Sequence, residues 1–202
     1  MALLFGKLVM VTSARPFARR RSDAGFTLLE LLITVAIIGT IAAIAVTVMP
    51  SVLTGMRSDS SVAQALNTIR IARDRAIAER RNIELSFISP NKVQIIREEI
   101  PGPATTVLST TYLENSQEFK QFVGLPDTPD AFGVSGPIAF GGSPKIIFTS
   151  EGTLVDSVGD PLNGTVFLGM EGQKTTARAV TIFGPTALLR VWKWDGSKWT
   201  EG

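Results

Sequence analysis

The sequence predicts an α+β protein in which a long N-terminal helix packs, through its second half, on an antiparallel β-sheet. Two features of the 202-residue chain lead to this prediction. The first part of the chain holds an apolar run and then a helical repeat, whereas the rest alternates between short strand patterns and turns. Nine of the 11 prolines and 14 of the 18 glycines follow residue 89, so the turn-forming residues gather in the second part.

The apolar run occupies residues 26–56 and carries a single charge, Glu30. Residues 31–56 form 26 consecutive uncharged positions, rich in Ile, Val, Leu and Ala, with no polar face. A bilayer span needs about 20 apolar residues, so this run is long enough to cross a membrane and continue beyond it. A helix that is apolar on all sides is either a membrane span or a fully buried core helix.

The residues before the run, 1–25, carry a net charge of +4, from Lys7, Arg15, Arg19, Arg20, Arg21 and Asp23. A cationic flank keeps its side of a span in the cytoplasm, so the downstream part is expected to be exported. The apolar run is too long for the short apolar region of a secretory signal peptide. Met1 and Met10 both remain possible starts.

The segment after the span, residues 57–81, repeats with helical spacing. One apolar stripe is predicted, from Val62, Ala65, Leu66, Ile69, Ala72, Ala76 and Ile77. We therefore expect one helix from Phe26 to about Arg81, roughly 80 Å long. Gly39 and Pro50 are its weak points, and Pro50 is expected to kink or loosen it.

Strand patterns begin at residue 82. Residues 82–88 and 92–98 read as a hairpin joined by a Ser-Pro-Asn turn. Four later strands are expected at 145–150, 165–170, 177–183 and 187–194, after which an Asp-Gly turn folds Trp199 back towards Trp194. Residues 100–143 are irregular around short strand candidates such as 107–113, and no fold is predicted for them.

The composition excludes several kinds of active site. Without His or Cys, the chain cannot hold a Ser-His-Asp triad, a thiol nucleophile or a Cys-based zinc site. A membrane-anchored hydrolase would need a convergent pair of carboxylates or a Ser-Lys arrangement, and the sequence shows a motif for neither. The adjacent Glu98 and Glu99 do not form such a pair, because neighbouring residues of a strand point to opposite faces. Calcium oxygens are available in Asp156, Asp160 and Asn163, but these are also ordinary turn formers. We expect no catalytic role, cofactor or metal.

The junction between residues 19 and 30 reads RRRSDAGFTLLE. It resembles the class III signal of type IV pilins and pseudopilins, which implies a pilin-like fold, cleavage by a prepilin peptidase after Gly25, and N-methylation of Phe26. A carboxylate in a span costs about 2.5–3.5 kcal/mol, and we expect no partner for Glu30 within its own chain. The resemblance implies that Glu30 pairs with the terminal amine of a neighbouring subunit and so directs assembly; the alternative is a Glu that reaches the membrane interface.

The resemblance extends to residues 65–87, 145–156 and 190–199, which look like the H-type minor pseudopilin (GspH) and FimT group. It implies a subunit of the periplasmic pseudopilus of a type II secretion system, anchored in the inner membrane and partnered by other pseudopilins. The alternative is a FimT-like minor pilin of a type IV pilus, serving pilus assembly or DNA uptake. The resemblance divides the chain into a leader (1–25), a transmembrane and filament-core helix (26–56), an amphipathic continuation (57–81) and a periplasmic head (82–202).

DNA binding is not expected of the head. Some FimT-type pilins carry a Gly-Arg-x-Arg motif, but here Pro185 follows Gly184 and only Arg190 remains of the arginines. Phosphate binding needs several cations close together, yet residues 82–202 carry 9 basic and 13 acidic side chains, a net charge of −4.

A cluster of large side chains lies near the C-terminus: Arg190, Trp192, Trp194 and Trp199. We expect the tryptophans to pack in a core or to staple a hairpin, because large aromatic side chains mostly serve packing. The alternative is a contact patch for a partner subunit. Loss of residues 1–25 would change the net charge of the chain from +2 to −2, so the basic character belongs to the leader.

Overall fold

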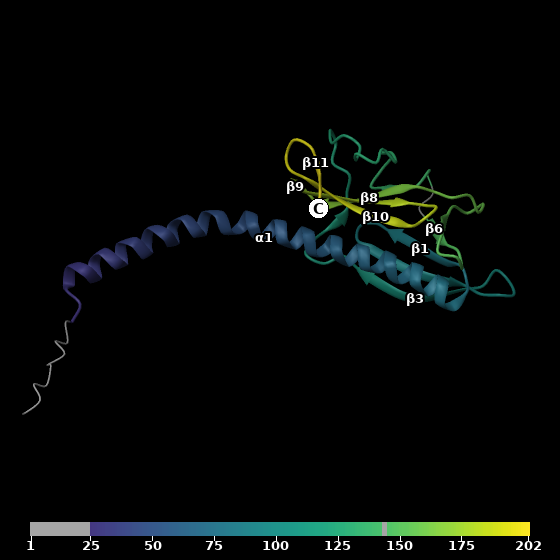
Figure 1. Ribbon diagram of the computed structural model, residues 1–202, viewed down its shortest axis with the longest axis horizontal. Helices are drawn as coiled ribbons and strands as arrows, with labels where there is room; N and C mark the ends of the chain where they lie inside the picture. Colours follow the sequence, from purple (N-terminus) through teal and green to yellow (C-terminus); the bar gives the residue numbers. More distant parts are fainter. Residues whose placement is uncertain (1–24, 143–144) are drawn as a thin grey trace, which may run out of the picture. The chain divides into compact units, whose positions relative to one another are not determined.

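The computed structural model describes residues 25–142 and 145–202, and it divides into two compact units on either side of the Ala45–Val46 bond. Helix α1 (Leu28–Glu79) begins in the first unit and ends in the second (Figure 1). It is two residues shorter at each end than expected, and it continues through Gly39 and Pro50. The predicted leader lies outside the described residues, except for Gly25.

Helix α1 ends in a Schellman motif. Arg80 adopts a positive φ of 51°, and the Arg81 backbone N–H donates to the Ala76 carbonyl at 3.2 Å. This turn leads at once into the first strand, so the hairpin that follows lies directly against the helix end.

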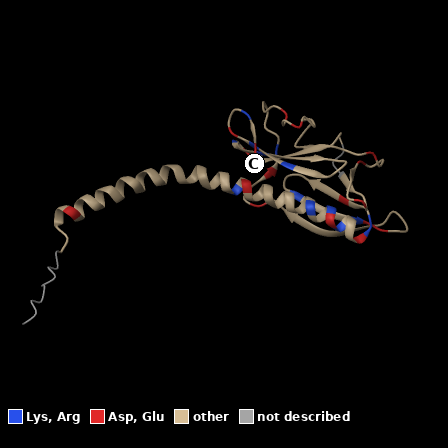
Figure 2. Cartoon of the chain, in the orientation of Figure 1, with Lys and Arg blue, Asp and Glu red and all other residues tan. Residues whose placement is uncertain are grey.

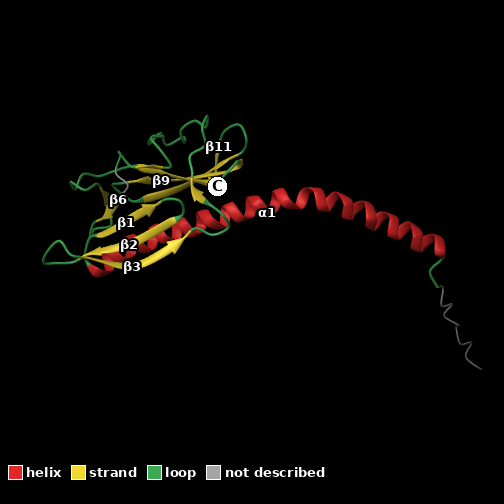
Figure 3. Ribbon diagram, turned by 180° about the vertical axis from the view of Figure 1, so that it is seen from behind, coloured by secondary structure: helices red, strands yellow, loops and turns green. Residues whose placement is uncertain are grey.

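The head unit contains two antiparallel sheets, whereas the sequence suggested one (Figure 3). The first sheet has the order β3-β2-β1-β6-β7, from Thr105–Tyr112, Lys92–Glu98, Ile83–Ile88, Lys145–Phe148 and Leu154–Val155. The second has the order β11-β10-β9-β8-β4, with β5 also paired to β8, from Trp199–Glu201, Leu188–Trp194, Gln173–Phe183, Gly164–Met170, Glu118–Phe119 and Ile138–Ala139.

The predicted α+β class is confirmed, as are the hairpin of β1 and β2 and the return of Trp199 against Trp194. The four later strands also form, as β6, β8, β9 and β10. Strand β3 forms at the candidate 107–113. Strands β4, β5 and β7 were not predicted because each is only two residues long and has no alternating pattern of its own.

One core joins α1 to both sheets. The predicted stripe is buried at Val62, Ala65, Ile69, Ala72 and Ala76, and it packs with one face of the first sheet and the inner face of the second. Ile77 differs from the prediction, being 44% exposed. Its side chain lies over Gly152, whose φ of 81° and missing Cβ leave room for it.

A buried arginine also links α1 to the second sheet. Arg178 of β9 is 1% exposed, and its Nε donates to Asp59 of α1 at 2.7 Å. The same guanidinium donates to the carbonyls of Thr175 and Ala177. A buried charge is tolerated only when it is paired and hydrogen-bonded, so Asp59 fixes the helix against this strand.

Candidate functional site

The start of α1 brings the predicted processing residues together. Gly25, Phe26 and Thr27 are exposed and precede the first helical residue. The Glu30 backbone N–H donates to Thr27 Oγ1 at 3.2 Å, and the Thr27 backbone N–H donates to Glu30 Oε2 at 3.4 Å. These reciprocal hydrogen bonds form a capping box, which satisfies two N–H groups at the helix start.

The expectation that Glu30 has no partner in its own chain is therefore wrong. The Thr-x-x-Glu spacing of Thr27 and Glu30 was visible in the sequence and is itself a capping signal. An ionised carboxylate offers about four lone-pair sites. The bond to Thr27 occupies one of them, so the capping box leaves Glu30 able to accept a further donor.

The remainder of the apolar run exposes its side chains on every side. No residue from 28 to 53 is buried, and this part of α1 carries no charge after Glu30 in Figure 2. The helix is long and apolar enough to cross a membrane. Such a surface needs a cover of lipid or of other apolar helices.

The three tryptophans of the predicted partner patch are buried in the head. Trp192, Trp194 and Trp199 are 7–9% exposed, and the rings of Trp194 and Trp199 meet edge to face at 5.4 Å. They form a small second core on the outer face of the second sheet, with Phe122, Phe167, Ala177 and Ala179. Their burial favours the packing role. Of the four predicted patch residues, Arg190 presents the largest exposed area, 48% of its side chain.

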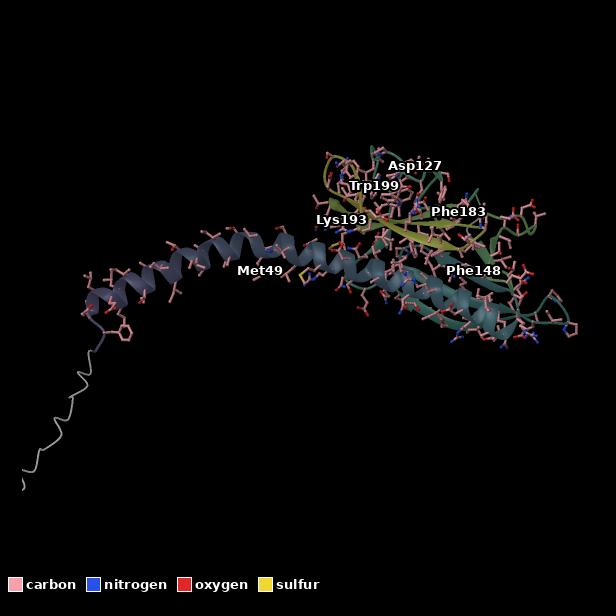
Figure 4. All side chains as sticks on the ribbon, in the orientation of Figure 1. Met49, Asp127, Phe148, Phe183, Lys193 and Trp199 are labelled. Atoms are coloured by element: carbon pink, nitrogen blue, oxygen red, sulfur yellow. The ribbon has the colours of Figure 1, made fainter. Side chains whose placement is uncertain are left out.

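An irregular segment covers this second core, and sequence reasoning gave no account of it. The Trp199 indole N–H donates to the Pro126 carbonyl at 2.9 Å, and Asp127 accepts from the Gly133 backbone N–H at 2.8 Å. Asp127 and Trp199 are labelled in this part of the head in Figure 4. The first contact joins the segment to β11, and the second folds the segment on itself.

Asp130 is the central residue of this arrangement. Its side chain is 10% exposed and accepts from the Thr181 hydroxyl at 2.6 Å and from the Trp192 indole at 3.0 Å. The Arg190 guanidinium donates to its other oxygen at 2.5 Å. Beside these groups lies a hollow of about 360 Å³, which is also lined by Phe132, Phe183 and Leu188. No residue pattern within 100–143 singles out Asp130, because its partners lie 51 to 62 positions away.

The hydrogen bonds determine how Asp130 ionises. Burial by itself would raise the pKa of this carboxyl, but the bonds from Thr181, Trp192 and Arg190 outweigh it and hold the pKa below its ordinary value. Asp130 therefore remains charged at neutral pH. Arg190 neutralises the charge of Asp130, so the Arg190 cation at this surface is already paired with a carboxylate.

Two of the three possible calcium residues hold the backbone: Asn163 Oδ1 accepts from the Gly184 backbone N–H at 2.8 Å, and Asp156 closes a turn. Asp156 Oδ1 accepts from the backbone N–H groups of Val158, Gly159 and Asp160 at 2.8–3.0 Å. Within residues 25–142 and 145–202, no group of three or more Asp, Glu, His or Cys side chains is arranged to hold a metal ion. Glu99 of the adjacent pair considered for hydrolysis is bound to Arg81 and Arg97.

Residues 20–46 match the family model of the prokaryotic N-terminal methylation motif, so the chain carries a type IV pilin-like N-terminus. No curated protein matches the chain. Among solved structures, the type IV minor pilin FimU of Pseudomonas aeruginosa strain PAO1 is similar in two crystal forms, at 16% identity and a TM-score of 0.46, over 70% of this chain and 91% or 96% of FimU. The minor pseudopilin EpsH from the Type 2 Secretion System of Vibrio cholerae is similar at 11% identity and a TM-score of 0.44, over 68% of this chain and 97% of EpsH.

Replacement of Asp130 should destabilise the head in a pH-dependent way. We expect Asp130→Asn to lower the free energy of unfolding by about 1–3 kcal/mol at neutral pH, because Arg190 and Trp192 lose a charged acceptor. The folded-state pKa is lowered, so the advantage of the wild type should be complete above about pH 5 and should shrink as the pH falls below the unfolded-state pKa of about 3.9. Denaturant unfolding followed by tryptophan fluorescence measures both effects.

Arg190→Gln is the matched comparison. Its side chain is about half exposed, and Thr181 and Trp192 continue to bind Asp130 when it is replaced, so the loss should be smaller. An Asp130→Asn protein with the stability and pH dependence of the wild type would contradict the central role of this carboxylate.

Proposed function

We propose that the chain is a minor pseudopilin, a structural subunit of the periplasmic pseudopilus that drives protein export by a type II secretion system. The observation that carries this proposal is the methylation motif at residues 20–46, joined to an apolar helix that is exposed from residue 28 to residue 53. The subunit performs no chemistry. It helps a filament to push folded substrates through an outer-membrane channel.

We place processing by the prepilin peptidase between Gly25 and Phe26, with N-methylation of the new Phe26 terminus. Both residues are exposed and non-helical, and Gly25 has no Cβ to hinder an extended backbone in a protease cleft. The leader stays in the cytoplasm, the apolar part of α1 spans the inner membrane, and the head lies in the periplasm.

Assembly buries the apolar surface of α1 among the helices of neighbouring pseudopilins. The uncharged stretch of 26 residues is longer than the 20 or so that a bilayer requires, which suits a helix that continues beyond the membrane. Glu30 would pair with the terminal amine of a neighbour through the acceptor sites that Thr27 leaves open. That pairing would set the register between subunits.

The charges of the head favour this role over a DNA-receptor pilin. At least five of its nine cations lie within 4 Å of a carboxylate: Arg97, Lys120, Arg178, Arg190 and Lys193. Phosphate binding depends on free cations close together. The single arginine left at the position of the Gly-Arg-x-Arg motif, Arg190, is already bound to Asp130.

The mature N-terminus tests the processing step. Intact-mass analysis of protein extracted from membranes should show the loss of residues 1–25 and the addition of one methyl group. The expected cleavage bond is Gly25–Phe26, where the apolar run begins with an aromatic residue. A mature protein that begins elsewhere would refute this assignment.

Glu30→Ala should leave membrane insertion intact and abolish incorporation into the filament. The substitution also removes half of the capping box, so Thr27→Ala is the control, because it removes the reciprocal cap and keeps the carboxylate. Incorporation is measured by co-purification with sheared filaments. Equal loss in both variants would assign the effect to helix capping and not to subunit pairing.

Deletion in the native host separates the two kinds of filament. We expect enzyme secretion to fail while twitching and transformation continue. Loss of twitching or transformation with normal secretion would overturn the secretion assignment and make the chain a minor pilin of a type IV pilus.

A further inference from the structure

A hollow of about 460 Å³ lies between α1 and the second sheet. Helix α1 contributes Pro50, Ser51, Thr54 and Gly55, and strands β9 and β10 contribute Gln173, Thr175, Thr176, Arg178 and Lys193. None of these lining residues carries a carboxylate. The volume is within the range of small-molecule sites, about 300–1,000 Å³. Figure 4 labels Met49 on α1 and Lys193 on β10 in this part of the molecule.

The position of the hollow along α1 places it at the surface of the membrane in which α1 is proposed to be inserted. The hydrocarbon core is about 30 Å thick, which corresponds to about 20 residues of helix. Counted from Leu31, the first residue after the Glu30 carboxylate, these residues end at Pro50. The headgroup layer adds about 5–7 Å, or about four further residues. The part of α1 that lines the hollow therefore lies at the depth of the lipid headgroups.

A buried guanidinium in the wall of the hollow keeps one donor group unused. Arg178 is 1% exposed; its Nε is bound to Asp59, and its Nη1 is bound to two backbone carbonyls. Its Nη2 has no acceptor among residues 25–142 and 145–202. This nitrogen is not one of the fully enclosed side-chain atoms that lack a partner, so it reaches the surface where Arg178 lines the hollow. Buried donors are normally satisfied, so an acceptor is expected there.

Lys193 supplies a second cation to the same wall. Its Nζ lies 3.9 Å from Asp59 Oδ2, and its side chain is 47% exposed. Asp59 therefore faces both Arg178 and Lys193, and the three groups together carry a net charge of +1. A phosphodiester has one negative charge, and its oxygens only accept hydrogen bonds. It therefore matches both the charge and the donors of this wall.

An adjoining hollow of about 450 Å³ suits a phosphate group less well. It shares Arg178 and Lys193 with the first hollow, but Asp59 also lines it. Much of the remaining lining is apolar: Val62, Ala63, Leu66 and Val191. A carboxylate in the lining repels an anion, so the phosphate group fits the hollow that Pro50 and Thr54 line.

The charges around the two hollows are balanced. Residues 57–59, 114–120, 171–178 and 193–201 contain the lining residues of this region or bond to them, and they hold six basic and six acidic side chains. The basic side chains are Arg57, Lys120, Lys174, Arg178, Lys193 and Lys198; the acidic ones are Asp59, Glu114, Glu118, Glu171, Asp195 and Glu201. Selection of a phosphate group therefore depends on the donors in the hollow and not on a long-range field.

The helix next to the hollow is suited to acyl chains. Val48 precedes Ser51 by three positions, so it lies on the same side of α1, and it is 51% exposed. Residues 31–50 carry no charge. A phospholipid has its phosphate at the membrane surface and its acyl chains below, which is the order of polar and apolar groups on this side of the molecule. A soluble phosphate would leave the apolar part uncovered.

We propose that this hollow binds a phospholipid from the membrane leaflet on the side of the head. Arg178 Nη2 and Lys193 Nζ would donate to the phosphodiester, and the acyl chains would lie along α1 beside Val48. The bound lipid would hold this part of the head at the membrane surface before the subunit enters a filament. The site rests on the proposed membrane insertion of α1, but not on the kind of filament that the chain joins.

Lipid binding to the full chain in detergent micelles tests the site. The probes are dioleoylphosphatidylglycerol, dioleoylglycerol, which has the same acyl chains without a phosphate, and inorganic phosphate. Native mass spectrometry counts the bound lipid and gives its dissociation constant. We expect dioleoylglycerol to bind at least about five-fold more weakly than the phospholipid, because it lacks the charged acceptor. Inorganic phosphate at the same concentration should not displace the phospholipid.

Two lysine variants with the same loss of charge locate the site. Lys193→Gln should weaken binding of the phospholipid about five-fold. Lys198→Gln removes a cation that does not line the hollow, and it should bind as the wild type does. Gly55→Leu fills the hollow without changing the charge and should also weaken binding. A Cβ at Gly55 meets no atom within 4 Å, so this variant is expected to fold. It replaces Lys193→Gln if the unfolding midpoint of that protein is lowered.

A fluorescent label measures the depth of the hollow in lipid nanodiscs. The chain has no Cys, so a bimane group can be placed at Thr175→Cys or, as the matched control, at Thr105→Cys. Thr105 lies opposite Glu98, beside the end of α1, which is 24 residues or about 36 Å of helix beyond Gly55. A lipid with a nitroxide on its headgroup should quench the label at Thr175 more strongly than the label at Thr105. Quenching of a label at Ala36→Cys by a nitroxide within the acyl chains reports insertion of α1 itself.

Four results would overturn the proposal: equal binding of the two lipids, equal binding by the two lysine variants, displacement of the lipid by inorganic phosphate, or equal quenching at Thr175 and Thr105. If the Ala36 label shows that α1 is inserted, each of these results removes the lipid site and leaves the membrane anchor in place. If that label is not quenched, the anchor and the lipid site are both wrong.

Discussion

The uncharged stretch of α1 is the constraint on which the rest of the molecule depends. From Leu31 to Met56 each turn presents large apolar side chains, and no residue from 28 to 53 is buried. Burial of one such side chain is worth about 1.5–3 kcal/mol, so the stretch must be covered by lipid or by other helices. The nearest charged residues lie outside the stretch, since Glu30 precedes its first residue and Arg57 follows its last.

The same helix then changes role without a break. Beyond Met56, small residues recur with helical spacing, and Ala65, Ala72 and Ala76 are almost fully buried. Their small side chains let the helix approach both sheets closely, while the Asp59–Arg178 ion pair fixes its position at one point. A single element therefore supplies both an apolar surface for other molecules and the centre of its own head.

The sequence predicted the parts of the fold that arise from local periodicity. The β1–β2 hairpin follows from alternation on both sides of a Pro-containing turn, and the Trp194–Trp199 pair follows from the Asp-Gly turn between them. The division into two sheets and the fold of residues 100–143 could not be predicted, because they depend on contacts such as those of Asp130 and of Trp199 with Pro126, which no periodicity marks. The Thr27–Glu30 capping box, by contrast, was predictable from its Thr-x-x-Glu spacing.

The two faces of the second sheet show where this head can vary. Its inner face is formed by alternate apolar residues of β8 and β9. Val166, Leu168, Val180 and Ile182 are all completely buried there. Its outer face is covered by an irregular segment that a few specific side chains hold, chiefly Asp130 and Trp199. Changes in that segment leave the inner packing untouched as long as those contacts remain. The outer face can therefore accept substitutions while the inner core, on which folding of the head depends, stays as it is.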